Sequence, residues 1–342
     1  MGWTKKGFCD TIGAMLKEKC PFFDRCGGCV WQDLSEKDYL AKKELFIRRA
    51  FSDAGLDDIP LKPIVLLPTG IRRRACFAFY QGHFGFNESH SHKIIEIDSC
   101  PLLLPEINAL ITDLRALIKR LGGAGDCFLL KTDLGVDVHL KDGRGLPDLS
   151  RLEILGELAG QSEVVRLMYN NTPIFEKAPS LYQADAFLQP SLEGEKTLVD
   201  LVLKNVGNSK RAVDLFCGYG TFTRPLTEIG LSVIGYDSDS RSVSTLGENG
   251  IQRDLFRNPL TPDELNEFDL AVLDPPRAGA KEQVLQLAET QIPRIIMVSC
   301  APKTGARDIK ILTAAGWRLR EITPVDQFTY SNHVEIVAVL EK

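Results

Sequence analysis

The sequence predicts an α/β protein: a doubly wound, Rossmann-like sheet joined to a central β-rich region and an N-terminal cysteine loop. Three observations carry this prediction. After about residue 191, short apolar strands alternate with helical stretches; residues 62–175 are crowded with strand-like segments; and three cysteines fall between Cys20 and Cys29. Strand–helix alternation is typical of a parallel sheet with helices on both faces.

Length and composition place the chain among ordinary globular proteins. Its 342 residues suffice for two or three domains, and 44% hydrophobic with 25% charged residues is a typical balance. No apolar run reaches membrane-spanning length, and MGWTKKGFCD lacks the apolar core of a signal peptide, so we expect a cytoplasmic protein. The net charge of -5 excludes a global field that attracts nucleic acid, so any such binding must use local patches.

The N-terminal region, residues 1–60, combines cysteines with one helix. Nine cysteines, an odd number, without a signal peptide argue against a disulfide framework and favour metal or thiol chemistry. A helical pattern covers Ser35–Ala54. Ser35 is its expected N-cap, with Asp38 as a weaker capping-box partner.

The central region alternates apolar and polar residues in short runs separated by Gly, Asn and Asp. One amphipathic helix, LPEINALITDLRALIKRL, interrupts it. The expected strands are RACFAFY, HFGF, KIIEID, CFLLKTD, GVDVHLK and VVRLMYN.

The C-terminal region has the strand–helix alternation of a doubly wound sheet. The final segments WRLREITPVDQF and HVEIVAVLEK predict an antiparallel hairpin that closes the sheet edge. The expected strands are RAVDLFCG, LSVIGYD, FDLAVLD and PRIIMVSC. The expected helices are Thr221–Ile229, Ser240–Asn249, Lys281–Glu289 and Thr304–Ala315.

A Gly-x-Gly turn follows the first of these strands, in VDLFCGYGTF. Gly218 and Gly220 let the backbone approach a ligand closely, and Asp237, at the end of the next strand, can bind ribose hydroxyls. The third glycine of a dinucleotide fingerprint is missing, since Arg224 and Pro225 occupy its neighbourhood. A tight structural turn is the alternative, but together these features favour a nucleoside-type ligand.

A rigid Asp274-Pro275-Pro276 turn ends the fourth strand of this unit. Ligands of open α/β sheets bind at the carboxyl ends of strands, and two prolines fix the turn. The turn could instead simply start a helix. With the Gly-x-Gly turn and Asp237, it suits S-adenosylmethionine better than a dinucleotide. Adenine N6-methyltransferases also have a Pro-Pro turn, but usually with a following aromatic residue, where Arg277 stands here.

Cys300 follows the next strand and opens a turn toward the same crevice. A small buried residue is the common fate of a lone cysteine, and Cys217 is a rival nucleophile that we expect to pack beneath the ligand. Glu335 lies on the last strand, where alternation with Val334 and Ile336 also permits a solvated position. A thiol and a carboxylate beside a methyl donor suggest methylation at pyrimidine carbon 5, with covalent and general-base catalysis.

These motifs resemble those of the RNA (uracil-5-)-methyltransferase family, in its iron–sulfur branch. The similarity runs from Cys20 to Glu335 through DLFCGYGTF, LDPPRAG, VSCAPKTGARDI and DQFTYSNHVE, in the family's order. It implies a class I methyltransferase fold dependent on S-adenosylmethionine, with Cys300 as nucleophile and Glu335 as base. The implied contacts to S-adenosylmethionine are Gln189, Phe216, Thr221, Asp237 and Asp274. Ala301, where the family usually has asparagine, and Pro190 depart from the pattern.

The cysteine cluster has the spacing Cys20-x5-Cys26-x2-Cys29, with Cys100 as a plausible fourth thiolate. Four thiolates suit either tetrahedral zinc or a 4Fe–4S cluster, and a triplet with one remote cysteine leans toward iron–sulfur. The family resemblance implies the 4Fe–4S cluster. We expect a structural or RNA-organising role.

Arg72, Arg73 and Arg74 stand beside an aromatic strand and are the predicted RNA contacts. A solvated charged face above a core strand is the alternative. The target base must leave its stack to reach Cys300, so we expect an unpaired loop as substrate. Only 19 residues precede Cys20, so we expect this chain to lack the small β-barrel RNA-binding domain of many family members.

The resemblance thus implies methylation of a uridine in RNA, with 23S rRNA as the expected substrate. The alternatives are a tRNA uracil-5 methyltransferase, an RNA cytosine-5 methyltransferase and a non-catalytic iron–sulfur RNA-binding protein. We expect no obligate protein partner. The predicted organisation is a cysteine loop and helix (residues 1–60), a central β-rich RNA-binding domain (61–175) and a methyltransferase domain (176–342).

Overall fold

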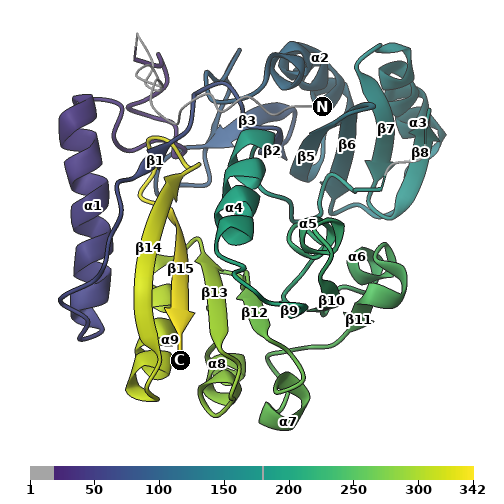
Figure 1. The fold of residues 1–342 in the computed structure, drawn as a ribbon. Coiled ribbons are helices and arrows are strands. Elements are labelled where there is room, and N and C mark those ends of the chain that lie inside the picture. Colours follow the sequence, from purple (N-terminus) through teal and green to yellow (C-terminus); the bar gives the residue numbers. More distant parts are fainter. Residues whose placement is uncertain (1–18, 179–180) are drawn as a thin grey trace, which may run out of the picture.

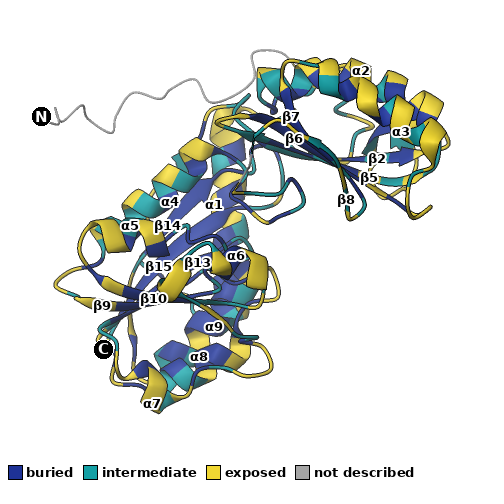
Figure 2. Cartoon of the chain, turned by 90° about the vertical axis from the view of Figure 1, so that its right-hand side faces the viewer, coloured by how far each residue is buried: buried dark blue, intermediate teal, exposed yellow. Residues whose placement is uncertain are grey.

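A computed structural model of the protein describes residues 19–178 and 181–342. The ten N-terminal residues that we expected to lack a leader signal lie outside this part. Two sheets organise the described chain, one in each lobe (Figures 1 and 2). Among the described helices, none combines the length and apolarity needed to cross a membrane.

The larger sheet has eight strands in the order β1-β14-β15-β13-β12-β9-β10-β11. All its pairings are parallel except those of β15, which is antiparallel to both neighbours. The doubly wound α/β prediction is therefore confirmed. The strands are β1 (Val65–Leu66), β9 (Arg211–Leu215), β10 (Ser232–Asp237), β11 (Gly250–Gln252), β12 (Leu270–Leu273), β13 (Arg294–Ser299), β14 (Arg318–Asp326) and β15 (Glu335–Glu341).

The C-terminal hairpin forms as predicted, but it does not close the sheet edge. Strand β15 is inserted between β13 and β14, and β1 pairs with β14 on the outer side. A two-residue strand from much earlier in the sequence thus supplies the edge. The last strand of the chain is consequently interior to the sheet.

Helices cover both faces of this sheet because its strands are apolar on both sides. Val213 and Leu215 pack with α1, α8 and α9 on one face, whereas Ala212 packs with α4 and α5 on the other. Figure 1 shows the two helical layers. The helices of this lobe are α1 (Glu36–Asp53), α4 (Leu192–Lys204), α5 (Thr223–Glu228), α6 (Ser240–Ser244), η2 (Gly247–Asn249), α7 (Pro262–Leu265), α8 (Lys281–Ala288) and α9 (Pro302–Ala314).

The second sheet has seven strands in the order β4-β3-β2-β5-β6-β7-β8, antiparallel except for the β6–β7 pair. Helix α2 (Pro105–Leu121) buries its apolar face against one side of it. A short helix α3 (Leu149–Gly156) and turn η1 (Glu157–Gly160) follow in the same layer (Figure 2). The strands are β2 (Arg74–Tyr80), β3 (His83–Asn87), β4 (Ile94–Ile95), β5 (Ala124–Thr132), β6 (Gly135–Asp142), β7 (Val164–Tyr169) and β8 (Thr172–Glu176).

Helix α1 starts at its predicted cap and packs on the larger sheet's lobe, not on the second sheet. The Ser35 side chain accepts a hydrogen bond from the Asp38 backbone N–H, and α1 packs beside α9. Lys43 of α1 is fully buried and forms an ion pair with Asp326 at the end of β14, 2.8 Å apart. The N-terminal helix is thereby joined to the loop between β14 and β15.

Candidate active site

The predicted catalytic and ligand-binding residues converge at one edge of the larger sheet. Parallel strands bring their carboxyl ends to the same edge, so Asp237 at the end of β10, Asp274 after β12 and Cys300 after β13 lie along it. Strand β15 runs the other way, and its Ile336 pairs with Ser299. That register sets Glu335, at the start of β15, beside the turn that carries Cys300.

The Gly-x-Gly turn after β9 depends on backbone conformations that favour glycine. Phe216, Gly218 and Gly220 have φ values of 65°, 52° and 85°. Asp237 fixes the turn, because its Oδ2 accepts a hydrogen bond from the Gly218 N–H at 3.0 Å and its Oδ1 accepts one from Asp239 at 2.9 Å. The acid predicted to meet a ribose therefore also shapes the loop beside it.

A cavity of about 240 Å³ opens between this turn and the Asp-Pro-Pro turn. Predicted residues that line it are Phe216, Gly218, Thr221, Asp237 and Asp274. Gly220 does not line it; a side chain there would overlap Leu246, so this glycine serves packing. Lining residues that the sequence analysis did not single out include Phe187, Tyr219, Ser238, Asp239, Ser242 and Phe256.

Cys300 and Glu335 share a partly desolvated, acidic environment. Burial, with help from the charges of Glu335 and Asp274, raises the pKa of the Cys300 thiol to about 12. Burial raises the pKa of Glu335 to about 7, against hydrogen bonding by Gln327 and the charge of Arg277. Burial and the Glu335 carboxylate hold the pKa of Asp274 well above its usual range. Glu335 is only 2% exposed, so the solvated position considered for it is wrong.

Two glutamines connect the carboxylates of this site. Gln189 donates a hydrogen bond from Nε2 to Oδ2 of Asp274 at 3.0 Å, and Gln327 donates from Nε2 to Oε1 of Gln189 at 2.8 Å. Gln327 also donates to Oε2 of Glu335 at 2.9 Å. Gln189 is buried and reaches the site through Asp274 rather than by lining the cavity. Gln327 was missed, although it lies at the end of the predicted strand WRLREITPVDQF.

Cys217, the rival thiol, lies in the Gly-x-Gly turn and lines the 240 Å³ cavity. It is buried, and a side chain at Gly235 would overlap its Sγ. Burial raises the pKa of the Cys217 thiol, and the Asp214 and Asp237 charges act in the same direction. Cys300 is half-buried and stands among the catalytic candidates, which makes it the better placed nucleophile.

Ala301 is the N-cap of α9, and its side chain makes no capping hydrogen bond. Asparagine at this position would accept from a first-turn N–H, whereas alanine leaves those donors uncapped. Pro302 at the first helical position removes one of them. The departure at Ala301 thus affects the cap of the helix that follows Cys300.

The three predicted RNA-binding arginines have different surroundings. Arg73 is buried, donating to the Gln189 carbonyl and to Glu195 at 2.6 Å, so it serves the fold. Arg74 is half-buried and bonds the Leu188 carbonyl. Arg72 is half-buried near the catalytic loop, where it lines a cavity of about 320 Å³ together with Arg277 and His333. None of the described residues that line this cavity is acidic.

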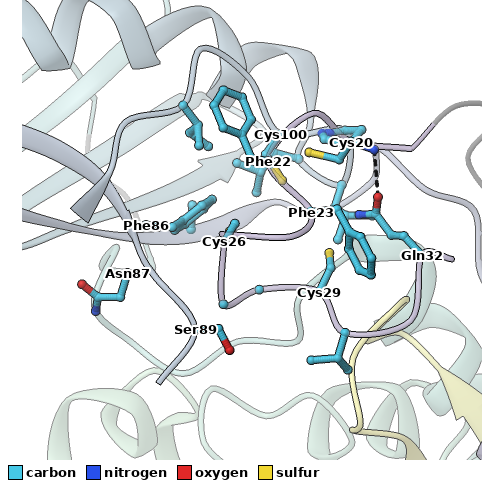
Figure 3. A pocket seen from close by; sticks show the side chains of 18 of the residues that line it. Cys20, Phe22, Phe23, Cys26, Cys29, Gln32, Phe86, Asn87, Ser89 and Cys100 are labelled. Atoms are coloured by element: carbon cyan, nitrogen blue, oxygen red, sulfur yellow. Dashed lines mark hydrogen bonds between the residues drawn. The ribbon is translucent and has the colours of Figure 1, made fainter. Parts of the chain in front are cut away.

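All four predicted cysteine ligands line a second, larger cavity of about 610 Å³ (Figure 3). Three of these thiols accept hydrogen bonds from N–H groups. The donors are the Gly28 backbone for Cys26, the Gln32 side chain for Cys29 and the Leu102 backbone for Cys100. The Gln32 side chain also accepts from the Cys20 backbone N–H at 2.9 Å.

The chemistry of this donor set fits a thiolate-bound metal or cluster, because thiolates accept such N–H bonds and are the ligands of both zinc and iron–sulfur sites. The distances between these described thiols, however, do not form a metal site. Across residues 19–178 and 181–342, no three His, Cys, Asp or Glu side chains stand close enough together to hold a metal ion.

Comparison with known proteins gives this geometry a family. The family model described as tRNA (Uracil-5-)-methyltransferase matches residues 251–342. An uncharacterized RNA methyltransferase of Brucella suis is 36% identical over 94% of this chain and 84% of that protein. The 23S rRNA (uracil(1939)-C(5))-methyltransferase RlmD of Pectobacterium atrosepticum is 29% identical over 95% of this chain and 80% of its own.

A solved structure shares the fold across both lobes. The Pyrococcus abyssi tRNA (uracil-54, C5)-methyltransferase, in complex with S-adenosyl-L-homocysteine, has a TM-score of 0.68 and 23% identity. It covers 95% of this chain, which covers 88% of that structure. The relatives and the family model show that the chain belongs to the RNA (uracil-5-)-methyltransferase family and is an enzyme that methylates carbon 5 of uridine in RNA with S-adenosylmethionine.

Proposed function

We propose that this enzyme methylates a uridine of 23S rRNA, with Cys300 as the covalent nucleophile and Glu335 as the general base. The pairing of β13 with β15 carries the proposal, because it sets the thiol-bearing turn beside a buried carboxylate. A thiol and a base side by side are what addition and elimination at a pyrimidine require.

The residues would act in sequence. Carbon 5 of uracil is a weak nucleophile. The Cys300 thiol therefore gives up its proton to solvent, and the resulting thiolate adds to carbon 6, which makes carbon 5 electron-rich. S-adenosylmethionine, when bound, supplies the methyl group. Glu335 then takes the proton from carbon 5, the electron pair restores the carbon 5–carbon 6 double bond, and the carbon 6–sulfur bond breaks to release the thiolate.

We assign the 240 Å³ cavity to the methyl donor. Asp237 is placed for ribose hydroxyls, and Phe216 and Thr221 line the same wall. Asp274 and the Asp-Pro-Pro turn form the opposite wall. Gln189 supports this site by holding Asp274.

We assign the approach of RNA to the 320 Å³ cavity beside the catalytic loop. Arg72 and Arg277 supply its positive charge, and Phe328 offers a ring for stacking. Arg74 adds a cation at the start of β2, whereas Arg73 is committed to Glu195. The seven-stranded sheet, from β2 to β8, would then form the RNA-binding domain that we expected at residues 61–175.

The choice of 23S rRNA rests on a named relative rather than on the site. The Pectobacterium protein is named for uracil 1939 of 23S rRNA, and the Pyrococcus structure for uracil 54 of tRNA. The relative is more similar in sequence, at 29% against 23% identity. We therefore favour the ribosomal target.

Nucleoside mass spectrometry tests reaction and target together. Anaerobically purified enzyme would be incubated with S-adenosylmethionine and with unmodified 23S rRNA or tRNA transcripts. New 5-methyluridine in the ribosomal transcript is the expected result. Product in tRNA alone would overturn the target, and 5-methylcytidine would overturn the base that is modified.

We further propose that Cys20, Cys26, Cys29 and Cys100 hold a 4Fe–4S cluster. The support is their common cavity, the N–H donors beside three thiols, and the preference of such clusters for four thiolates. The cluster would tie the N-terminal loop to the second sheet and supplies no step of methyl transfer.

Cys29→Ser and Cys76→Ser test this assignment. Both thiols line the same cavity, but Cys76 lies on β2 outside the proposed set. Iron and sulfide would be measured after anaerobic purification, with the visible absorption spectrum. Cys29→Ser should lose iron and Cys76→Ser should keep it. Equal iron in both variants, or zinc in the wild-type protein, would contradict a 4Fe–4S cluster on this set.

A further inference from the structure

Gln327 occupies a buried position between the proposed base and the methyl-donor site. It follows Asp326, the last residue of β14, and is 4% exposed. Its Nε2 lies 2.9 Å from Oε2 of Glu335 and 2.8 Å from Oε1 of Gln189. The two bonds link the start of β15 to the segment that precedes α4.

The surroundings of Gln327 define which end of its amide makes the bonds. Its nitrogen faces two acceptors, whereas its Oε1 is buried without a hydrogen-bond partner among the described residues. That oxygen lies against Gly194 in the first turn of α4, where any larger side chain would overlap it. Turning the amide over would place its oxygen against the Gln189 oxygen and the Glu335 carboxylate. The amide is therefore held as a double donor.

The backbone that presents Gln327 is itself anchored. The neighbouring Asp326 is fully buried, pairs with Lys43 and accepts a hydrogen bond from the Tyr39 hydroxyl. Lys43 also donates to the His333 carbonyl, two residues before Glu335. Gln327 and Glu335 are thus held from both ends of the loop that separates them.

We propose that Gln327 is a positioning residue for the general base: its amide orients the Glu335 carboxylate and favours the anion that accepts the carbon 5 proton, and through Gln189 it joins the base to Asp274. This inference rests on the proposed role of Glu335. It adds a residue that lines neither the 240 Å³ cavity nor the 320 Å³ cavity.

Electrostatics around Glu335 explain why such a donor matters. The Glu335 carboxylate raises the pKa of both neighbouring acids, Asp274 after β12 and the Cys300 thiol after β13, and the buried Asp214 of β9 also raises the pKa of Asp274. Arg277 favours the Glu335 anion. Burial raises the pKa of Glu335 to about 7, and the Gln327 hydrogen bond acts to lower it. Removing that bond should raise the pKa further.

The sign of the pH effect follows from the chemistry. Glu335 accepts a proton only as the carboxylate, so the rate of product formation rises with pH through its pKa. A higher pKa moves this rise to higher pH. Loss of one charge-assisted hydrogen bond should therefore shift this rising limb of the pH–rate profile by about one pH unit to higher pH.

Gln327→Met is the first variant, because methionine keeps length and removes the donor. Single-turnover formation of 5-methyluridine would be followed from about pH 6 to about pH 9, with denaturing gels for RNA–protein adducts carrying the transferred methyl group. We expect the alkaline shift and accumulation of the methylated adduct, since slower proton removal delays release of Cys300. A merely structural residue would produce neither.

Gln327→Glu is the second variant and preserves shape. It sets a carboxyl group against Glu335, so its limb should shift further than that of Gln327→Met. Gln283→Met is the matched control, because Gln283 is also fully buried and bonds both the N–H and the carbonyl of Leu260. It should lower the melting temperature and keep the wild-type pH limb.

Glu335→Gln distinguishes a failure of the proposed mechanism from a failure of the role assigned to Gln327. If Glu335→Gln keeps the wild-type rate and limb, Glu335 is not the base, and the proposed mechanism and this inference both fail. If Glu335→Gln stops turnover while both Gln327 variants keep the wild-type pH profile and accumulate no more methylated adduct than the wild-type enzyme, only the role of Gln327 is overturned. A shift in both Gln327 variants, absent in Gln283→Met, establishes it.

Discussion

The active-site edge of the larger sheet and the cysteine cavity of the N-terminal loop hold their reactive side chains in different ways. At the sheet edge, strand register fixes the backbone and a chain of glutamines fixes the carboxylates Asp274 and Glu335. In the cysteine cavity, the loop consists of short turns, and the Cys26 backbone forms an isolated antiparallel β-bridge with Glu88 after β3. The first site is organised by the protein alone.

This contrast indicates that a bound group would order side chains in the cysteine cavity rather than at the active-site edge of the sheet. The acid–amide chain at the sheet edge consists entirely of protein side chains, so catalytic geometry there is preorganised. The cysteines share a cavity but not a metal-ligand arrangement among the described residues. We therefore expect substitutions at the sheet edge to change chemistry and substitutions near the cysteine loop to change stability or RNA binding.

Cys300→Ala sharpens this comparison with the largest expected effect. It should abolish 5-methyluridine formation, because no other described thiol stands beside Glu335 to add at carbon 6, while S-adenosylmethionine affinity stays within about twofold. Calorimetric binding and nucleoside mass spectrometry measure the two quantities. Methylation that persists in this variant would contradict the assignment of the nucleophile.

Lys43→Met would break the connection between α1 and the catalytic loop. It leaves the fully buried Asp326 without its cation, which should cost about 3–5 kcal/mol in the free energy of unfolding. Urea unfolding monitored by circular dichroism measures the loss. Arg48→Met on the exposed face of α1 breaks an exposed pair with Glu44 and should cost about 0.5 kcal/mol or less. Equal losses would show that the buried pair has no special weight.

Arg72→Ala tests a predicted RNA contact. Arg72 lines both the cysteine cavity of about 610 Å³ and the cavity of about 320 Å³ beside the catalytic loop. If it contacts a phosphate, RNA affinity should fall severalfold, and the slope of log affinity against log salt should decrease by about one. Lys204→Ala is the control, since Lys204 ends α4 near the opposite edge of the sheet. Filter binding at several salt concentrations compares them, and identical slopes would remove Arg72 from the RNA surface.

Ala301→Asn has the smallest expected effect and acts on the sheet edge alone. Asparagine should cap α9 and stabilise the protein by about 1 kcal/mol. Thermal unfolding would show a higher midpoint. An unchanged midpoint would mean that the introduced side chain does not accept a hydrogen bond from the first turn of α9.

The sequence analysis succeeded where local pattern and global fold agree. Apolar alternation located β2 at Arg74–Tyr80 and the amphipathic period located α2, because each buries one face. It did not predict α4 or the edge strand β1, whose two residues carry no periodic signal. Pairing partners of short strands depend on tertiary contacts that no local window contains.

For the candidate site, motifs identified residues but not their environments. Cys300 and Asp274 could be named because each ends a strand, whereas alternation left Glu335 open to solvent and the structure buries it. Arg73 looked equivalent to its neighbours, and only the fold pairs it with Glu195. Gln327 lies in the motif DQFTYSNHVE, but the motif assigned it no role, because that role depends on Gln189, 138 positions away.

The interior position of β15 also has a consequence for synthesis. The base Glu335 sits on the last strand, which must enter between β13 and β14. Until Glu335–Glu341 leave the ribosome, β13 and β14 lack the strand that pairs with both of them. Lys43 likewise lacks its ion-pair partner until Asp326, 283 positions downstream, has been synthesised. Contacts of such sequence separation form late in folding. A chain truncated before Glu335 therefore lacks both the proposed base and the strand that joins β13 to β14, so it cannot form this active site.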